Sequence, residues 1–250
     1  MASAFPSLSL PFLSAYDPPG TNEGKLDPMG LYQIADQLAV KLVPAVRERM
    51  LRVRFLTAMA VGALLTEEIE ADPEQIDAAP YLAWEWLLIE GMVRAGIDPK
   101  EMLGVPGSSV TRTAIRNHGY LDARSYLKTP RIFGFNGVYK RLAVHLRIVD
   151  VHLAPGPIAE RLADSWAKGQ GFGSFRAARA LHEPWAAAVR RSLAERPPRT
   201  RAKWGAEAWS QLAAAFAPNG AKKEEKRFLR DLLLGGVDQR LGALPQIWKL

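Results

Sequence analysis

The sequence lacks cysteine and lacks any apolar run long enough to cross a membrane. Without Cys, a disulfide-stapled secreted domain is excluded, and so is a cysteine-ligated zinc site. The longest apolar stretch, residues 55–65, contains 11 residues, whereas a membrane helix needs about 20. No basic residue precedes Lys25, so the N-terminus has no basic region of a secretory signal and is expected to be an extended arm. We expect a cytoplasmic protein with a buried helix over 55–65 and no membrane partner.

Acidic residues are scarce in the middle of the chain. Residues 111–147 contain 8 Lys or Arg and a single acid, Asp122. Residues 1–110 contain 8 Lys or Arg against 15 acids, and residues 148–250 contain 17 against 10. The formal net charge of +7 thus combines −7, +7 and +7 in succession. This asymmetry indicates that the central segment, and not the N-terminal part, contacts an anionic partner.

Helical periodicity dominates the sequence and predicts a mainly α protein. Apolar residues recur at helical spacing in the N-terminal part over 31–42, 46–66 and 80–96, which predicts a helical bundle. The last part predicts a helical C-terminal region, with helices over 158–166, 174–189, 204–216 and 222–234. Changes in charge and pattern divide the chain into an acidic helical domain over 1–107, a basic module over 108–156 and a basic helical region over 157–250.

The basic module has the element order of a DNA-binding motif. Turn residues separate three short predicted helices over 108–118, 122–128 and 137–146, and the β-branched alternation of 148–153 predicts a strand. Three short helices followed by a strand are typical of a winged helix-turn-helix, whose third helix lies in the DNA major groove. The sequence therefore predicts a central winged-helix-like module with a short β element.

Basic and aromatic side chains alternate through this module, and Lys and Arg neutralise phosphates. The residues predicted to contact double-stranded DNA are Arg124, Lys128, Arg131, Asn136, Tyr139, Lys140, Arg141 and Arg147. Winged helices also serve as protein docking modules, so the alternative is a helical scaffold whose basic face docks an acidic protein partner.

A second basic cluster, Arg47, Arg49, Arg52 and Arg54, lies on the predicted helix 46–66. Arginines at this spacing could clamp a phosphate, but more often they form ion pairs with nearby acids. The acidic loop over 67–77 favours the second interpretation, so these arginines are expected to have a structural role.

The sequence has no catalytic signature. Its four histidines show no metal-ligand spacing, and neither a nucleophile elbow nor a paired-carboxylate motif is evident. We expect no metal, no cofactor and a non-enzymatic protein, with an enzyme as the less favoured alternative.

Two stretches carry a resemblance to known proteins. Residues 26–31, LDPMGL, precede the arginine-rich stretch 46–54, and residues 126–135, YLKTPRIFGF, precede the predicted helix 137–146. Over 26–166 the sequence resembles uncharacterised bacterial helical, winged-helix-like proteins encoded among restriction and anti-phage defence genes. The resemblance implies an accessory subunit that assembles with other protein subunits, beside a nuclease or motor supplied by another chain.

Overall fold

The computed structural model describes residues 31, 34, 35, 38, 45, 46, 49–70, 78–200 and 204–235. The chain forms two compact units, 1–39 and 40–250. In the first unit Leu31, Ile34 and Leu38 are helical, as predicted, and their side chains are exposed. The predicted N-terminal arm and most of the acidic loop over 67–77 lie outside the described residues.

The second unit is built from helices, and its described residues contain no strand. In chain order the elements are α2 (Phe55–Thr66), α3 (Pro80–Arg94), α4 (Ser108–His118), α5 (Pro130–Phe133), α6 (Phe135–His145), α7 (Ala159–Gly169), the 3-10 turn η1 (Arg176–Ala178), α8 (Arg179–Ala194), α9 (Ala206–Phe216) and α10 (Lys223–Leu233). The mainly α class is confirmed. None of the helices described is both long and apolar enough to span a lipid bilayer.

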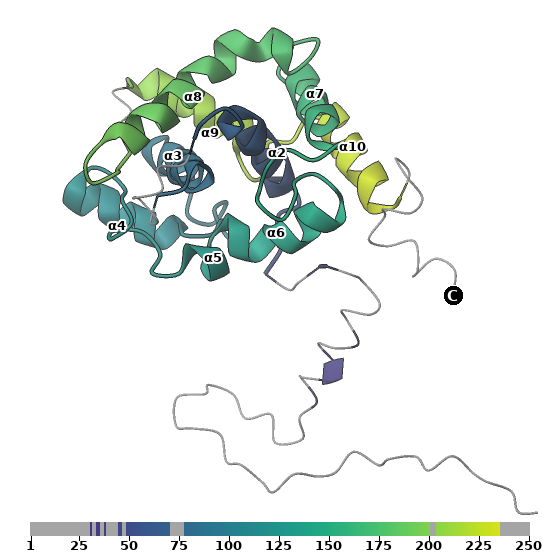
Figure 1. Ribbon diagram of the computed structural model, residues 1–250, viewed down its shortest axis with the longest axis horizontal. Helices are drawn as coiled ribbons and strands as arrows, with labels where there is room; N and C mark the ends of the chain where they lie inside the picture. Colours follow the sequence, from purple (N-terminus) through teal and green to yellow (C-terminus); the bar gives the residue numbers. More distant parts are fainter. Residues whose placement is uncertain are drawn as a thin grey trace, which may run out of the picture. The chain divides into compact units, whose positions relative to one another are not determined.

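Helix α2 runs through the centre of this unit, as its composition predicts (Figure 1). It is apolar around its whole circumference, and α3, α6, α7 and α8 pack against it. Beside it, Trp166 stacks on Phe216 with ring centroids 5.3 Å apart, and both rings contact Trp185. This aromatic cluster joins α7, α8 and α9, so the C-terminal helices complete the core around α2.

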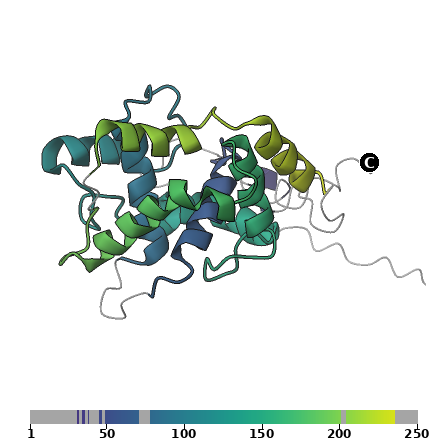
Figure 2. The same ribbon diagram turned by 90° about the horizontal axis from the view of Figure 1, so that it is seen from above.

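The core extends across the predicted domain boundaries at 107 and 156. Helix α3 packs against α4, α8 and α9, and α2 packs against both α6 and α7. Helices α4 and α10 lie at opposite ends of the unit in both views (Figures 1 and 2). Residues 40–250 therefore form one compact body in which the central basic segment is packed on helices from both sides of the sequence.

The predicted strand over 148–153 is not formed. Val149 makes an isolated bridge with Pro155, and the carboxylate of Asp150 accepts the backbone N–H groups of His152 and Ala154 at 2.8 and 2.9 Å. An alternating β-branched run forms a strand only when a second strand pairs with it, and here the chain turns back at once. The β element of the predicted winged helix is therefore missing from the described part of the chain.

One further predicted helix is replaced by a turn, and another is shortened. Over 122–128, the Asp122 carboxylate accepts the N–H groups of Arg124 and Ser125 at 3.0 and 2.7 Å, a local turn that competes with a helix. The helix predicted from 46 begins only at Phe55. Of the described arginines before it, Arg49 and Arg54 lie in turns and Arg52 lies in backbone without regular secondary structure.

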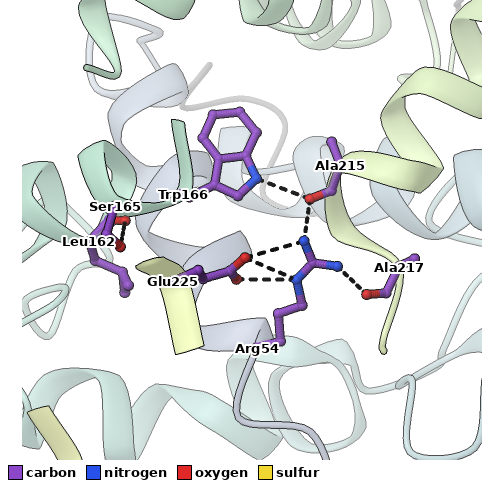
Figure 3. Close-up of polar contacts among 7 residues, drawn as sticks. All are labelled: Arg54, Leu162, Ser165, Trp166, Ala215, Ala217 and Glu225. Carbon is purple, nitrogen blue, oxygen red and sulfur yellow. Dashed lines mark hydrogen bonds and ion pairs between the residues drawn. The ribbon is translucent and has the colours of Figure 1, made fainter. Parts of the chain in front are cut away.

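Arg54, the residue before α2, is buried and contacts the C-terminal helices. Its Nε lies 3.1 Å from Oε1 of Glu225 in α10, its Nη2 donates to the carbonyl of Ala215 at 2.8 Å, and its Nη1 donates to the carbonyl of Ala217 (Figure 3). Trp166 donates to the same Ala215 oxygen at 3.0 Å. We call these five residues the Arg54 clamp. The structural interpretation of this arginine is confirmed, but its acidic partner comes from α10 and not from the loop 67–77.

Candidate functional site

A groove of about 630 Å³ lies between the beginning of α3 and the loop that leads into α5. Helix α3 supplies two aromatic side chains to its lining, Tyr81 and Trp86. The loop and α5 supply three cations, Arg124, Lys128 and Arg131. We call this hollow the basic groove. It brings together three of the eight residues predicted from the sequence to contact DNA.

The described residues supply no counter-charge to the cations of the basic groove. Its three cationic side chains are exposed, and none of its described lining residues is acidic. The acid nearest in sequence, Asp122, directs one carboxylate oxygen to two backbone N–H groups and to the Ser125 hydroxyl. Within the described residues, no ion pair involves Arg124, Lys128 or Arg131. These cations are therefore available to an anionic ligand.

The buried carboxylate of Glu85 holds one wall of the groove in place through hydrogen bonds. Oε1 of Glu85 accepts the hydroxyl of Tyr126, a groove residue, at 2.6 Å, and the backbone N–H groups of Phe135 and Asn136 also donate to this carboxylate. Glu85 thus caps the N-terminus of α6 from a different helix. Burial raises the pKa of the Glu85 carboxyl to about 7, although the hydrogen bond from Tyr126 and those from the backbone lower it in part.

Two glycines allow close contacts at the start of α6. Gly134, at the cap position of α6, has no side chain to offer, and a Cβ there would lie 2.3 Å from Glu85 Oε1. Gly137, in the first turn of α6, would place a Cβ 2.1 Å from the backbone of Ile132. Because only glycine fits at these contacts, the corner between α5 and α6 is tight and holds Arg131 and Ile132 at the groove.

The corner also exposes apolar surface next to the cations. The side chains of Ile132 and Phe133 are 56% and 48% exposed. The guanidinium carbon of Arg49 lies 5.3 Å from the centroid of the Phe133 ring, a cation–π contact. Apolar and basic groups therefore share the face that α5 presents.

The other predicted contact residues lie outside the groove lining that the structure describes. Arg141 and Arg147 are exposed, while Asn136 and Lys140 are half-buried. Tyr139 is fully buried, and its hydroxyl accepts the backbone N–H of Arg52 at 3.2 Å. The prediction that Tyr139 contacts DNA is wrong, because this ring lies on the core face of α6 beside Val138 and Leu142.

Two residues of this region were not predicted from the sequence. Glu85 is the one charged residue in the otherwise apolar stretch 81–89, and an acid in such a run is a signal of a buried carboxylate. Trp86 lines the groove and is fully buried, and its indole Nε1 has no hydrogen-bond partner in the part of the chain described. A tryptophan in an apolar helix carries no comparable sequence signal, since most such rings are core residues.

Neither metal ligands nor known relatives add to this picture. The described residues contain no group of three or more His, Asp or Glu side chains placed to hold a metal ion. No protein-family model matches the chain, and neither a curated protein nor a solved structure matches it. What this region can do follows from its own geometry, a groove lined by three exposed cations.

Proposed function

We propose that this protein is a non-enzymatic subunit that binds double-stranded DNA through the basic groove and the neighbouring cations of α6. The observation that carries the proposal is the convergence of Arg124, Lys128 and Arg131 on one groove whose described lining has no acid. Phosphate neutralisation by Lys and Arg supplies most of the affinity of such proteins for DNA, because it releases condensed counterions.

Helix α6 extends the contact surface beyond the groove. On α6 Arg141 is exposed and Lys140 is half-buried, while Val138 and Leu142 face the core. Arg147, two residues after the end of α6, is also exposed. The order α4, α5, α6 supports a role for α6 like that of the third helix of a helix-turn-helix. A wing is not needed on this proposal, since the groove provides the phosphate contacts that a wing would otherwise make.

The resemblance to proteins encoded among restriction and anti-phage defence genes suggests the setting. On this proposal the protein works in the bacterial cytoplasm as an accessory subunit, beside a nuclease or motor in another chain. Its own part is to hold the DNA.

The second candidate is a scaffold that docks an acidic protein partner. The exposed Ile132 and Phe133 favour it, because apolar anchors surrounded by charged groups are typical of protein interfaces. An acidic partner would meet the same three cations of the basic groove.

Duplex binding as a function of salt tests the first candidate. We expect the affinity of the wild-type chain to fall steeply as salt rises, and Lys128→Glu/Arg131→Glu to lose binding and lower the slope of log affinity against log salt by about two. Lys140→Glu/Arg141→Glu tests α6 in the same way. The control is Arg191→Glu/Lys226→Glu, the same change of charge at exposed positions of α8 and α10. A flat salt response, or equal binding by the groove variant and the control, would contradict DNA binding.

A further inference from the structure

The basic groove is concave and has the size of a small-molecule site. Its volume of about 630 Å³ falls within the range of about 300–1,000 Å³ that ligand pockets occupy. A phosphodiester within a duplex is flanked by sugars on both sides and carries one negative charge. The three cations lining the groove exceed what one such diester can neutralise. A phosphomonoester matches them better, since it carries roughly −1.5 to −2 at neutral pH and has three free oxygens.

The donors of the groove suit this group. Arg124 and Arg131 present planar guanidinium groups that bind phosphate oxygens in pairs, and Lys128 adds a compact ammonium. Trp86 also lines the groove, but its ring is fully buried, so the donors that a ligand meets are the three exposed cations.

The loop that carries the cations is held in place before any ligand binds. The Asp122 turn fixes the backbone at Arg124, and Tyr126 is tied to Glu85 at 2.6 Å. Gly107, with φ 73°, lets the Tyr126 hydroxyl approach so closely that a Cβ there would lie 2.5 Å from it. Preorganisation of this kind lowers the ordering cost of binding.

We infer that the basic groove is a binding site for a phosphomonoester, either the phosphate at the 5′ end of a DNA strand or that of a free mononucleotide. The DNA-end arm of this inference rests on the proposed function, whereas the mononucleotide arm does not. A terminal phosphate then occupies the groove most tightly, and internal phosphates of the duplex also bind along the exposed Arg141 and Arg147.

The test compares two versions of one DNA hairpin with a single blunt end, one carrying a 5′-phosphate and the other a 5′-hydroxyl, by fluorescence anisotropy with the full chain. We expect the phosphorylated end to bind about tenfold more tightly. A deoxynucleoside 5′-monophosphate should displace it, and the corresponding nucleoside should not. Lys128→Gln/Arg131→Gln should abolish the preference for the phosphorylated hairpin. The matched variant Arg141→Gln/Arg147→Gln should weaken binding of both hairpins but retain this preference.

Equal binding of the two hairpins by the wild type, together with no binding of the mononucleotide, overturns the inference while duplex binding stands. A preference that persists in Lys128→Gln/Arg131→Gln also overturns it. Mononucleotide binding that depends on the groove cations, with no binding of either hairpin, supports the phosphomonoester site and overturns the proposed function.

Discussion

The Arg54 clamp and the basic groove place cations of the same kind in opposite environments. Arg54 is 4% exposed and meets the Glu225 carboxylate and two backbone carbonyls. The cations of the groove are exposed and have no acidic partner among the described residues. Acceptors supplied by the fold make an arginine part of the core, and without them its charge is left for a ligand. The predictions below separate these two roles.

The largest effect is expected from Glu225→Gln, which breaks the clamp. It leaves the Arg54 guanidinium buried without its counter-charge, and removal of one partner of a buried ion pair typically costs about 3–5 kcal/mol of unfolding free energy. Urea denaturation followed by circular dichroism measures this loss. The matched control is Glu183→Gln, which removes an exposed carboxylate that pairs with Arg179 and Arg190 and should cost less than about 1 kcal/mol. Equal losses in the two variants would show that the clamp is not a core element.

Glu85→Gln should change how stability depends on pH. The folded-state pKa of Glu85 is raised from 4.5 to about 7, so between these values the native chain binds more protons than the unfolded chain. Its contribution to stability therefore falls as pH rises from about 4.5 to about 7, by roughly 3 kcal/mol, and levels off above that. The glutamine stays neutral and should remove this fall. Urea midpoints of the wild type and of Glu85→Gln at about pH 5 and about pH 8 measure this fall in stability. Equal changes between the two pH values in both proteins would contradict the raised pKa of Glu85.

Neutralising the groove should affect binding and leave folding unchanged. Lys128→Gln/Arg131→Gln removes no hydrogen bond or ion pair within the described residues, so the free energy of unfolding should stay within about 0.5 kcal/mol of the wild type. The salt dependence of duplex binding should nevertheless weaken by about two units. A large loss of stability would mean that these cations belong to the core, as Arg54 does.

The smallest effect is expected from Tyr139→Phe. The substitution removes the hydroxyl that accepts the Arg52 N–H and should cost about 1 kcal/mol of stability. Duplex affinity should not change, because the ring is buried in the core. A specific loss of DNA affinity in a fully folded variant would restore Tyr139 to the contact surface.

Helix positions were largely predictable because local signals mark them. Pro80 starts α3, and Gly119, with φ 74°, ends α4, both where the sequence predicts. The misplaced elements depend on information from elsewhere in the chain. A strand over 148–153 requires a pairing partner that the described residues do not provide. The helix predicted from 46 begins only at Phe55, after Arg54, whose ion-pair partner comes from the distant α10.

The candidate site was predictable in its charges and not in its shape. Composition alone pointed to Arg124, Lys128 and Arg131, because the central segment has one acid among its many cations. The floor of the groove comes from α3, some 40 residues earlier in the chain, and pairing of Glu85 with Tyr126 spans 41 positions. No periodic pattern encodes such a contact. The helical period of Val138 and Leu142 does indicate the core face of α6, but the prediction counts Tyr139 among the polar positions although its ring belongs to that face.

The Arg54 clamp also sets an order for biosynthesis. Arg54 and Glu225 are 171 positions apart, so the guanidinium leaves the ribosome long before its counter-charge has been translated. The centre of the fold cannot be neutralised until α10 emerges, and contacts of such long sequence separation are slow to form. The growing chain should therefore depend on α10 to become resistant to proteases, and it should be a target of chaperones until α10 has been translated.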